Sequence, residues 1–100
     1  MALERYGFIV KSPDLNLFTN HSQIATDNFN MMVCGVPDGD HATYAAQEML
    51  TKDVQLIEMC GAFTAEEVEK VREAVRDIVP VGFVQYTDQE RNRIKEALSK

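Results

Sequence analysis

Apolar residues in this sequence gather in short runs that polar and turn-forming residues interrupt. A run of four to eight apolar, aromatic or β-branched residues bounded by such breaks is typical of a strand. The second to fourth runs are apolar almost throughout rather than alternating, which is typical of a parallel sheet with helices on both faces. The runs predict strands over residues 6–11, 29–36, 54–60 and 81–86.

Three further segments carry apolar residues at helical spacing. Residues 41–51 place small alanines on one face, behind a turn in which Asp38 or Asp40 can cap the helix. Thr64 opens a capping-box pattern, which predicts a second helix that Pro80 terminates.

The last helix and the first long connection have weaker patterns. Thr87 repeats the capping logic and predicts a helix that runs to Leu98 with few apolar residues. The polar stretch from Ser12 to Asn28 has no sustained period, and we interpret it as an ordered loop or a poor helix. The order β-loop-β-α-β-α-β-α predicts an α/β fold in which helices pack on a small, four-stranded, mainly parallel sheet, with residues 1–100 forming a single domain.

The charge balance narrows the range of partners. The chain has 16 acidic and 10 basic residues and a net charge of −6, so it lacks the positive field that attracts phosphate backbones or anionic lipids. We therefore expect neither nucleic acid nor a membrane surface as a partner. No run approaches the length of a membrane helix or a signal h-region, and we expect a cytoplasmic protein.

Motifs for metals and cofactors are weak. Cys34 and Cys60 stand in neither a Cys-x-x-Cys pair nor a disulfide framework, so we expect two reduced thiols. His21 and His41 have no ligand spacing relative to these cysteines, and we expect no metal site. The glycine patterns of phosphate and dinucleotide loops are missing, which leaves any cofactor unknown.

Glu58 is the residue that most favours a functional site. On the predicted strand it alternates with Leu56 and Cys60, which would place a carboxylate on a covered, apolar side. An unpaired carboxylate there would have a raised pKa and could act as a general acid or base, whereas a cationic or backbone partner would make it structural.

Cys60 is the second catalytic candidate. It precedes Gly61 and a capped helix, whose amino terminus would favour a thiolate; a small buried side chain at a tight turn is the alternative. Because ligands of parallel sheets collect at the carboxyl ends of strands, residues at those ends are candidates for binding a small molecule. These candidates are Lys11, Cys34, Gly35, Gly61, Thr64 and Tyr86.

Two blocks resemble a known family. The segments 56–63 (LIEMCGAF) and 79–86 (VPVGFVQY), together with 8–10 and 33–37, look like a family of bacterial proteins of about one hundred residues, classed as a domain of unknown function. The resemblance spans most of the chain and implies no activity. It places Glu58, Cys60, Gly61 and Gly82 in the recognisable blocks without assigning them a role.

Two functions follow from these patterns. The first is a small protein that binds or acts on a small molecule at the strand ends, around Glu58 and Cys60. The second is a non-enzymatic, homo-oligomeric assembly or interaction module, because a narrow sheet has two edges to cover and the last helix has little apolar surface. In either case we expect self-association. The terminal helix is the element that we expect to dock on a neighbouring subunit, because residues 88–100 carry four basic and three acidic side chains while the rest is acidic.

Overall fold

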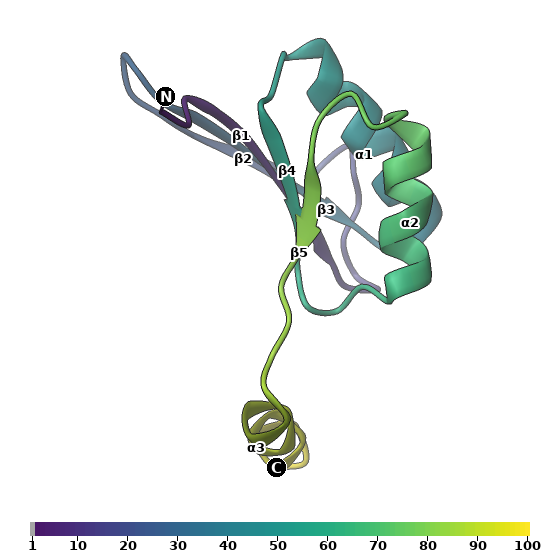
Figure 1. Ribbon diagram of the computed structural model, residues 1–100. Helices are drawn as coiled ribbons and strands as arrows, with labels where there is room; N and C mark the ends of the chain where they lie inside the picture. Colours follow the sequence, from purple (N-terminus) through teal and green to yellow (C-terminus); the bar gives the residue numbers. More distant parts are fainter. Residues whose placement is uncertain (1) are drawn as a thin grey trace.

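A computed structural model describes residues 2–100 of the chain. Strands and helices follow one another in the order β-β-β-α-β-α-β-α (Figure 1). The elements are β1 (Arg5–Lys11), β2 (His21–Ala25), β3 (Asn30–Val36), α1 (Gly39–Thr51), β4 (Leu56–Met59), α2 (Ala65–Ala74), β5 (Val81–Phe83) and α3 (Asp88–Leu98).

One mainly parallel sheet organises the molecule, in the strand order β2-β3-β1-β4-β5. β1 lies at the centre and pairs in parallel with β3 and β4, and β5 continues the parallel ladder beside β4. β2 pairs antiparallel with β3 at one edge. The predicted α/β fold is confirmed, but the sheet has five strands rather than four.

The additional strand is β2, in the stretch that we interpreted as a loop or a poor helix. All its residues are exposed, so they carry no buried apolar alternation that a sequence pattern could reveal. β2 is held by its backbone ladder to β3, and short polar strands of this kind are common at sheet edges. The interpretation was wrong for residues 21–25 because backbone pairing, rather than side-chain burial, creates this strand.

Both packed helices lie on the same face of the sheet (Figure 1). The chain passes from β3 over β1 to β4 and then to β5, moving across the sheet in one direction throughout. Two crossover connections of the same hand that move in the same direction place their helices on the same face. The expectation of helices on both faces was therefore wrong, and the opposite face of the sheet lacks a helical layer.

The core lies between this sheet and the two helices. Ile9, Ile57 and Met59 are fully buried beneath the helices, at alternate positions of their strands. The small residues of α1 are fully buried as well, which lets the helix approach the sheet closely, as their spacing predicted. At Gly7 an added Cβ would lie 2.4 Å from Met49 Sδ, so a helix side chain occupies the space that the missing side chain leaves.

Local signals place most element ends near their predicted positions. Asp38 caps α1, and Thr64 with Glu67 forms the predicted capping box of α2. α2 ends at Ala74, before the predicted stop at Pro80, and the chain then turns through Arg76 and Asp77 with positive φ. The strands β4 and β5 are shorter than the apolar runs that predicted them: β4 begins two residues later and ends one residue earlier, and β5 ends three residues earlier.

α3 stands apart from the sheet and its helices. It forms over the predicted residues, and the Thr87 hydroxyl accepts from the Glu90 N–H at its start. None of its residues is buried, and the helix lies beyond the carboxyl end of β5 at the end of an extended segment (Figure 1). Within residues 2–100, no helix has the length and apolar character needed to cross a membrane.

The contact at Gly7 leads to a test of helix packing. Gly7→Ala should lower the free energy of unfolding by about 1–3 kcal/mol, because Met49 is fully buried and has little room to move. Gly82→Ala is the matched control, since nothing lies within 4 Å of a Cβ there, and its effect should stay within about 0.5 kcal/mol. Urea unfolding measures both variants, and equal losses would show that α1 does not restrict position 7.

Candidate functional site

The carboxyl ends of β1 and β4 bring together three of the predicted site residues. The backbone N–H of Lys11 donates to Cys60 Sγ at 3.3 Å, which places the thiol directly beside the end of β1. Thr64 caps α2 on the same side, and Lys11 reaches the capping box through Glu67. Lys11, Cys60 and Thr64 therefore form the strand-end cluster that the parallel topology predicted.

Glu67 is the central residue of this strand-end cluster. Its Oε1 accepts from Lys11 Nζ at 2.7 Å and from the Thr64 N–H at 2.8 Å. A Cβ added to Gly39 would lie 2.8 Å from Glu67 Oε2, so the carboxylate also rests against the first turn of α1. Helix amino termini favour anions, and here the chain supplies its own. The sequence showed Glu67 only as half of a capping box.

Opposing effects act on the pKa of Glu67. Partial burial raises it, but the hydrogen bonds from Lys11 and Thr64 and the charge of Lys11 outweigh burial, so the pKa lies below its usual range. The Lys11 and Glu67 side chains are each 21% exposed, which limits solvent screening of the pair. Lys11 Nζ also lies 5.3 Å from the centre of the Phe63 ring. The strand-end cluster therefore contains an ion pair, Lys11–Glu67, in which the chain neutralises its own lysine.

Gly61 and Tyr86 meet beside this cluster. A Cβ at Gly61 would lie 2.7 Å from the Tyr86 ring, so the glycine allows an aromatic side chain to approach the backbone. The Tyr86 ring thus occupies the space beside Gly61, a residue that we expected to bind a ligand.

Glu58 lies on the opposite face of the sheet from the helices. On β4 the buried residues are Ile57 and Met59, which face the helices. Glu58 stands between them in the sequence, so its side chain points to the other face and is only half-buried. The expectation that Glu58 lies on the side covered by the core was therefore wrong. The Tyr6 hydroxyl donates to Glu58 Oε1. Burial raises the pKa of Tyr6, and the hydrogen bond to Glu58 and its charge raise it further. The Glu58 carboxylate thus has a phenol, rather than a cation, as its hydrogen-bond partner. Cys60 Sγ accepts a hydrogen bond from the Lys11 N–H and makes none with Glu58.

Cys34 and Gly35 are not part of the strand-end cluster. They follow each other on β3 and so point to opposite faces of the sheet. Gly35 is covered by Leu15, whose Cδ1 would lie 3.0 Å from an added Cβ. Cys34 is 6% exposed and lies on the helix side.

Cys34 borders a hollow between α1, β2 and β3, which we call the α1–β3 groove. It has a volume of about 1180 Å³ and runs along α1, from His41 to Thr51. This volume is slightly larger than the volume of about 300–1,000 Å³ that is usual for small-molecule sites. The groove is lined by Leu17, Phe18, His21, Ser22, Gln23, Asn30, Met32, Val33, Cys34, His41, Tyr44, Gln47, Glu48, Thr51 and Lys52.

The groove combines aromatic and polar side chains from α1, β2 and β3. The rings of His41 and Tyr44 meet edge to face, with their centres 6.3 Å apart. His41 Nδ1 lies 2.7 Å from Asp38 Oδ1, and the His41 N–H and ring hold the pKa of Asp38 below its usual range. Burial, followed by the charge of Glu48, raises the pKa of the Cys34 thiol.

The predicted site residues include only one member of the groove, Cys34. A signal for the others was present on α1, where Tyr44, Glu48 and Thr51 recur at helical spacing beside the alanine face. His21 and Gln23 gave no such signal, because β2 itself was not predicted. No group of three or more His, Cys, Asp or Glu side chains in residues 2–100 is arranged to hold a metal ion.

Sequence comparison places this arrangement in a family. A model described as "Family of unknown function (DUF6506)" matches residues 4–99. The chain belongs to the DUF6506 family. Neither the curated proteins nor the solved structures yield a match to it. The predicted resemblance to a family of unknown function is thereby confirmed at the level of the family, and any function of this DUF6506 protein has to be argued from its own geometry.

The ion pair at the strand ends of this DUF6506 protein predicts a pH-dependent stability. Glu67→Gln should lower the free energy of unfolding by about 1–3 kcal/mol at neutral pH, because it removes a charge-assisted hydrogen bond. The folded-state pKa of Glu67 is depressed, so its contribution is complete above the unfolded pKa of about 4.3 and is lost as pH falls through the folded value.

Urea unfolding of the wild type and Glu67→Gln over a pH series measures this difference. Glu66→Gln, at an exposed neighbouring position, is the control and should change stability little at any pH. A difference for Glu67→Gln that persists unchanged in strong acid would show that its charge contributes nothing.

The two thiols of this DUF6506 protein should differ in reactivity. Iodoacetamide should alkylate Cys60 before Cys34, because Cys34 is buried and its pKa is raised. Glu48→Gln should speed the alkylation of Cys34 by removing the nearby negative charge, whereas Glu73→Gln on α2 should leave the rate unchanged. Timed mass spectrometry of peptides measures both rates, and faster labelling of Cys34 in the wild type would contradict its neutral, protected state.

Proposed function

We propose that this protein binds a small, planar organic molecule in the α1–β3 groove. The proposal rests on the groove itself, a hollow of about 1180 Å³ that is lined by both apolar and polar side chains. Small-molecule sites commonly combine a concave, largely apolar surface with a few polar groups that orient the ligand. The expectation of a small-molecule ligand is kept, and its position moves from the strand ends to this groove.

The lining supports a ligand with an aromatic ring. Tyr44 is 61% exposed although it lines the groove, so much of its side chain is available to a ligand. Met32 and Leu17 pack against the core from the same surface and supply adaptable apolar contact. A flat ring fits between the aromatic side of α1 and these apolar side chains.

The polar groups support an amide or carboxylate on that ring. Gln23 and Asn30 form a side-chain pair across β2 and β3, with Nε2 and Oδ1 2.8 Å apart. Gln47 of α1 adds an amide, and Lys52, the C-cap residue of α1, adds a cation. Such donors and acceptors recognise planar polar groups, whose hydrogen bonds then fix the orientation of the ring.

The groove favours binding over catalysis. The thiol in its lining is that of Cys34, whose raised pKa keeps it protonated at neutral pH and so makes it a poor nucleophile. Both cysteines are free thiols, which supports placing the protein in the reducing cytoplasm. Glu58 and Cys60, the catalytic candidates of the sequence, lie outside the groove lining.

Titration of the ¹⁵N-labelled chain with benzamide and with benzoate tests the proposal. Backbone amide signals from α1, β2 and β3 should shift together with either probe, while those of β4 and α3 stay in place. Tyr44→Ala should weaken the binding by at least about tenfold, because a stacked aromatic contact is lost.

Tyr86→Ala is the matched control. It removes a tyrosine that is 42% exposed but lies at the strand-end cluster, so binding should not change. Loss of binding in Tyr86→Ala with none in Tyr44→Ala would return the site to the strand ends. If neither probe shifts the groove signals, the proposal is overturned.

A further inference from the structure

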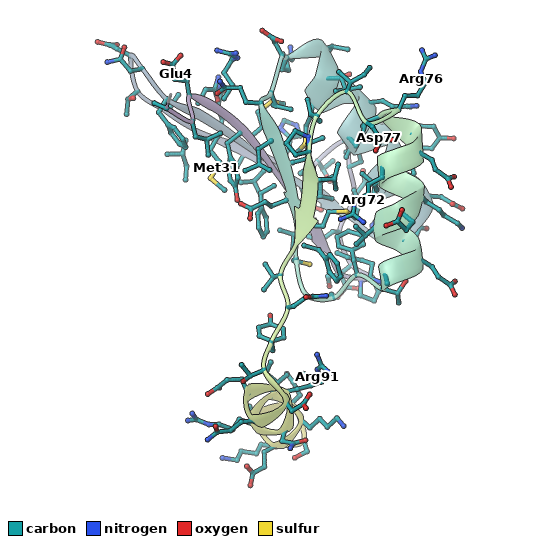
Figure 2. The ribbon with its side chains drawn as sticks, in the orientation of Figure 1. Glu4, Met31, Arg72, Arg76, Asp77 and Arg91 are labelled. Atoms are coloured by element: carbon teal, nitrogen blue, oxygen red, sulfur yellow. The ribbon has the colours of Figure 1, made fainter. Side chains whose placement is uncertain are left out.

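The face of the sheet opposite the helices, here called the open face, is rich in apolar side chains. In Figure 2, Met31 projects from the sheet on the side away from α1 and α2. Strand register places Tyr6 beside Met31 and Leu56, and Phe8 beside Val33 and Glu58. The open face is formed by Tyr6, Phe8, Val10, Met31, Val33, Leu56, Glu58 and Gly82, none of which is fully buried. Gly35 belongs to the same face at the carboxyl end of β3, where Leu15 covers it.

The open face lacks a cover at its β5 side. A Cβ built on Gly82 meets no atom within 4 Å. Val84 continues the same side of the chain and is 36% exposed, while Ile24 at the β2 side is 59% exposed. A contiguous apolar surface of this kind marks an interaction site in proteins that remain in solution.

α3 has an apolar stripe that nothing else in residues 2–100 covers in this structure. Its apolar residues Ile94 and Leu98 lie on one stripe, and Leu98 is 80% exposed. An isolated helix of 11 residues is marginal in water and depends on packing of its apolar side. The helix therefore needs a surface that its own sheet does not provide in this structure.

The segment before α3 directs the helix away from its own open face. The Val84 N–H donates to Met59 O at 2.9 Å, which extends the ladder beyond β5. The Tyr86 ring rests on Gly61, and Arg91 Nη2 donates to Tyr86 O at 3.2 Å, so the start of α3 is tied to the segment that leads to it. These contacts hold α3 beyond the carboxyl edge of the sheet, as Figure 1 shows.

We propose that the open face is covered by α3 of a second copy of this chain, in a reciprocal dimer. Each copy extends its helix past the sheet edge and receives the partner's helix on its own open face. Both contacts are then identical, which gives the closed twofold symmetry common among homodimers. Ile94 and Leu98 lie against the apolar residues of the open face.

Charge supports the same occupant. Residues 88–100 carry four basic and three acidic side chains, whereas residues 1–87 carry 6 basic and 13 acidic ones. Glu58 is the charged residue among the strand positions of the open face, and Arg91 lies on the same helical stripe as Ile94 and Leu98. Docking of α3 therefore brings the Arg91 guanidinium to the face that carries the Glu58 carboxylate. Within residues 2–100 of one chain, Glu58 accepts a hydrogen bond from Tyr6 and has no cation as a partner.

Sedimentation equilibrium of the full chain at micromolar concentration tests the proposal. The wild type should have the mass of a dimer. Ile94→Asp on α3 and Met31→Asp on the open face should each raise the dissociation constant by at least about tenfold, because each places a charge in the apolar contact. Circular dichroism checks that both variants, which alter positions outside the buried core, remain folded.

Ile78→Asp is the matched control. Ile78 is 66% exposed and follows α2, away from both surfaces, so this variant should remain dimeric. A dimer that dissociates equally in all three variants would show a general effect of added charge and would overturn the assignment of the interface.

Mixing the two weakened variants distinguishes reciprocal docking from other arrangements. A heterodimer of Ile94→Asp with Met31→Asp retains one intact contact, between α3 of the second copy and the open face of the first. The mixture should therefore associate more strongly than either variant alone. A monomeric wild type, a dimer that Ile94→Asp leaves intact, or a mixture no stronger than its components would each overturn the proposal.

The outcome does not depend on the proposed ligand site. Tyr44 lies on α1, on the helix side of the sheet, whereas Val33 borders both the groove and the open face. The variants that test the two proposals, Tyr44→Ala and Met31→Asp, each change a residue of one surface alone, so probe binding and dimer formation can fail separately.

Discussion

The position of β1 between β3 and β4 is the constraint on which the rest of the structure depends. Because β1 occupies the centre, the chain must pass from β3 over it to reach β4 and then continue to β5 in the same direction. Both crossover helices consequently pack on one face, and Ile9, at the centre of β1, is fully buried beneath them. A single layer of helices leaves the other face of the sheet half-exposed. The open face follows directly from this one-sided core.

At the ends of the parallel strands, where topology predicts a ligand site, side chains of the protein itself occupy the site. Two helix amino termini, a lysine and a thiol meet there, as they do in many ligand sites of open sheets. In this chain the Glu67 carboxylate occupies the place that an anion would take, and the Tyr86 ring covers Gly61. The strand-end cluster is therefore bonded within the chain, whereas the α1–β3 groove is open and lined by side chains with unused surface. The two proposals consequently concern different faces: a ligand on the helix side and a second copy of the chain on the open face.

Much of the fold could be predicted from residue patterns, and less of the candidate site. The apolar runs located β1, β3, β4 and β5, and the capping residues Asp38, Thr64 and Thr87 marked the starts of all three helices. β2 was missed because its residues are exposed and its stability comes from backbone pairing. Of the predicted site residues, Lys11, Cys60 and Thr64 meet because parallel topology brings strand ends together. Glu58 was assigned to the covered side because periodicity shows which residues share a face but does not say which face a helix covers.

The sequence by itself determined most of the local structure: the extended segments other than β2, the helices, and which residues alternate between two faces. These properties depend on neighbours within a few positions, so the printed residues are sufficient to indicate them. Only the tertiary structure decided that both helices lie on one side, that Glu67 pairs with Lys11, 56 residues away along the chain, and that His21 joins His41 and Tyr44 around one groove. Each of these contacts joins elements whose separation in sequence carries no information on their distance in space, and it is strand order that brings them together.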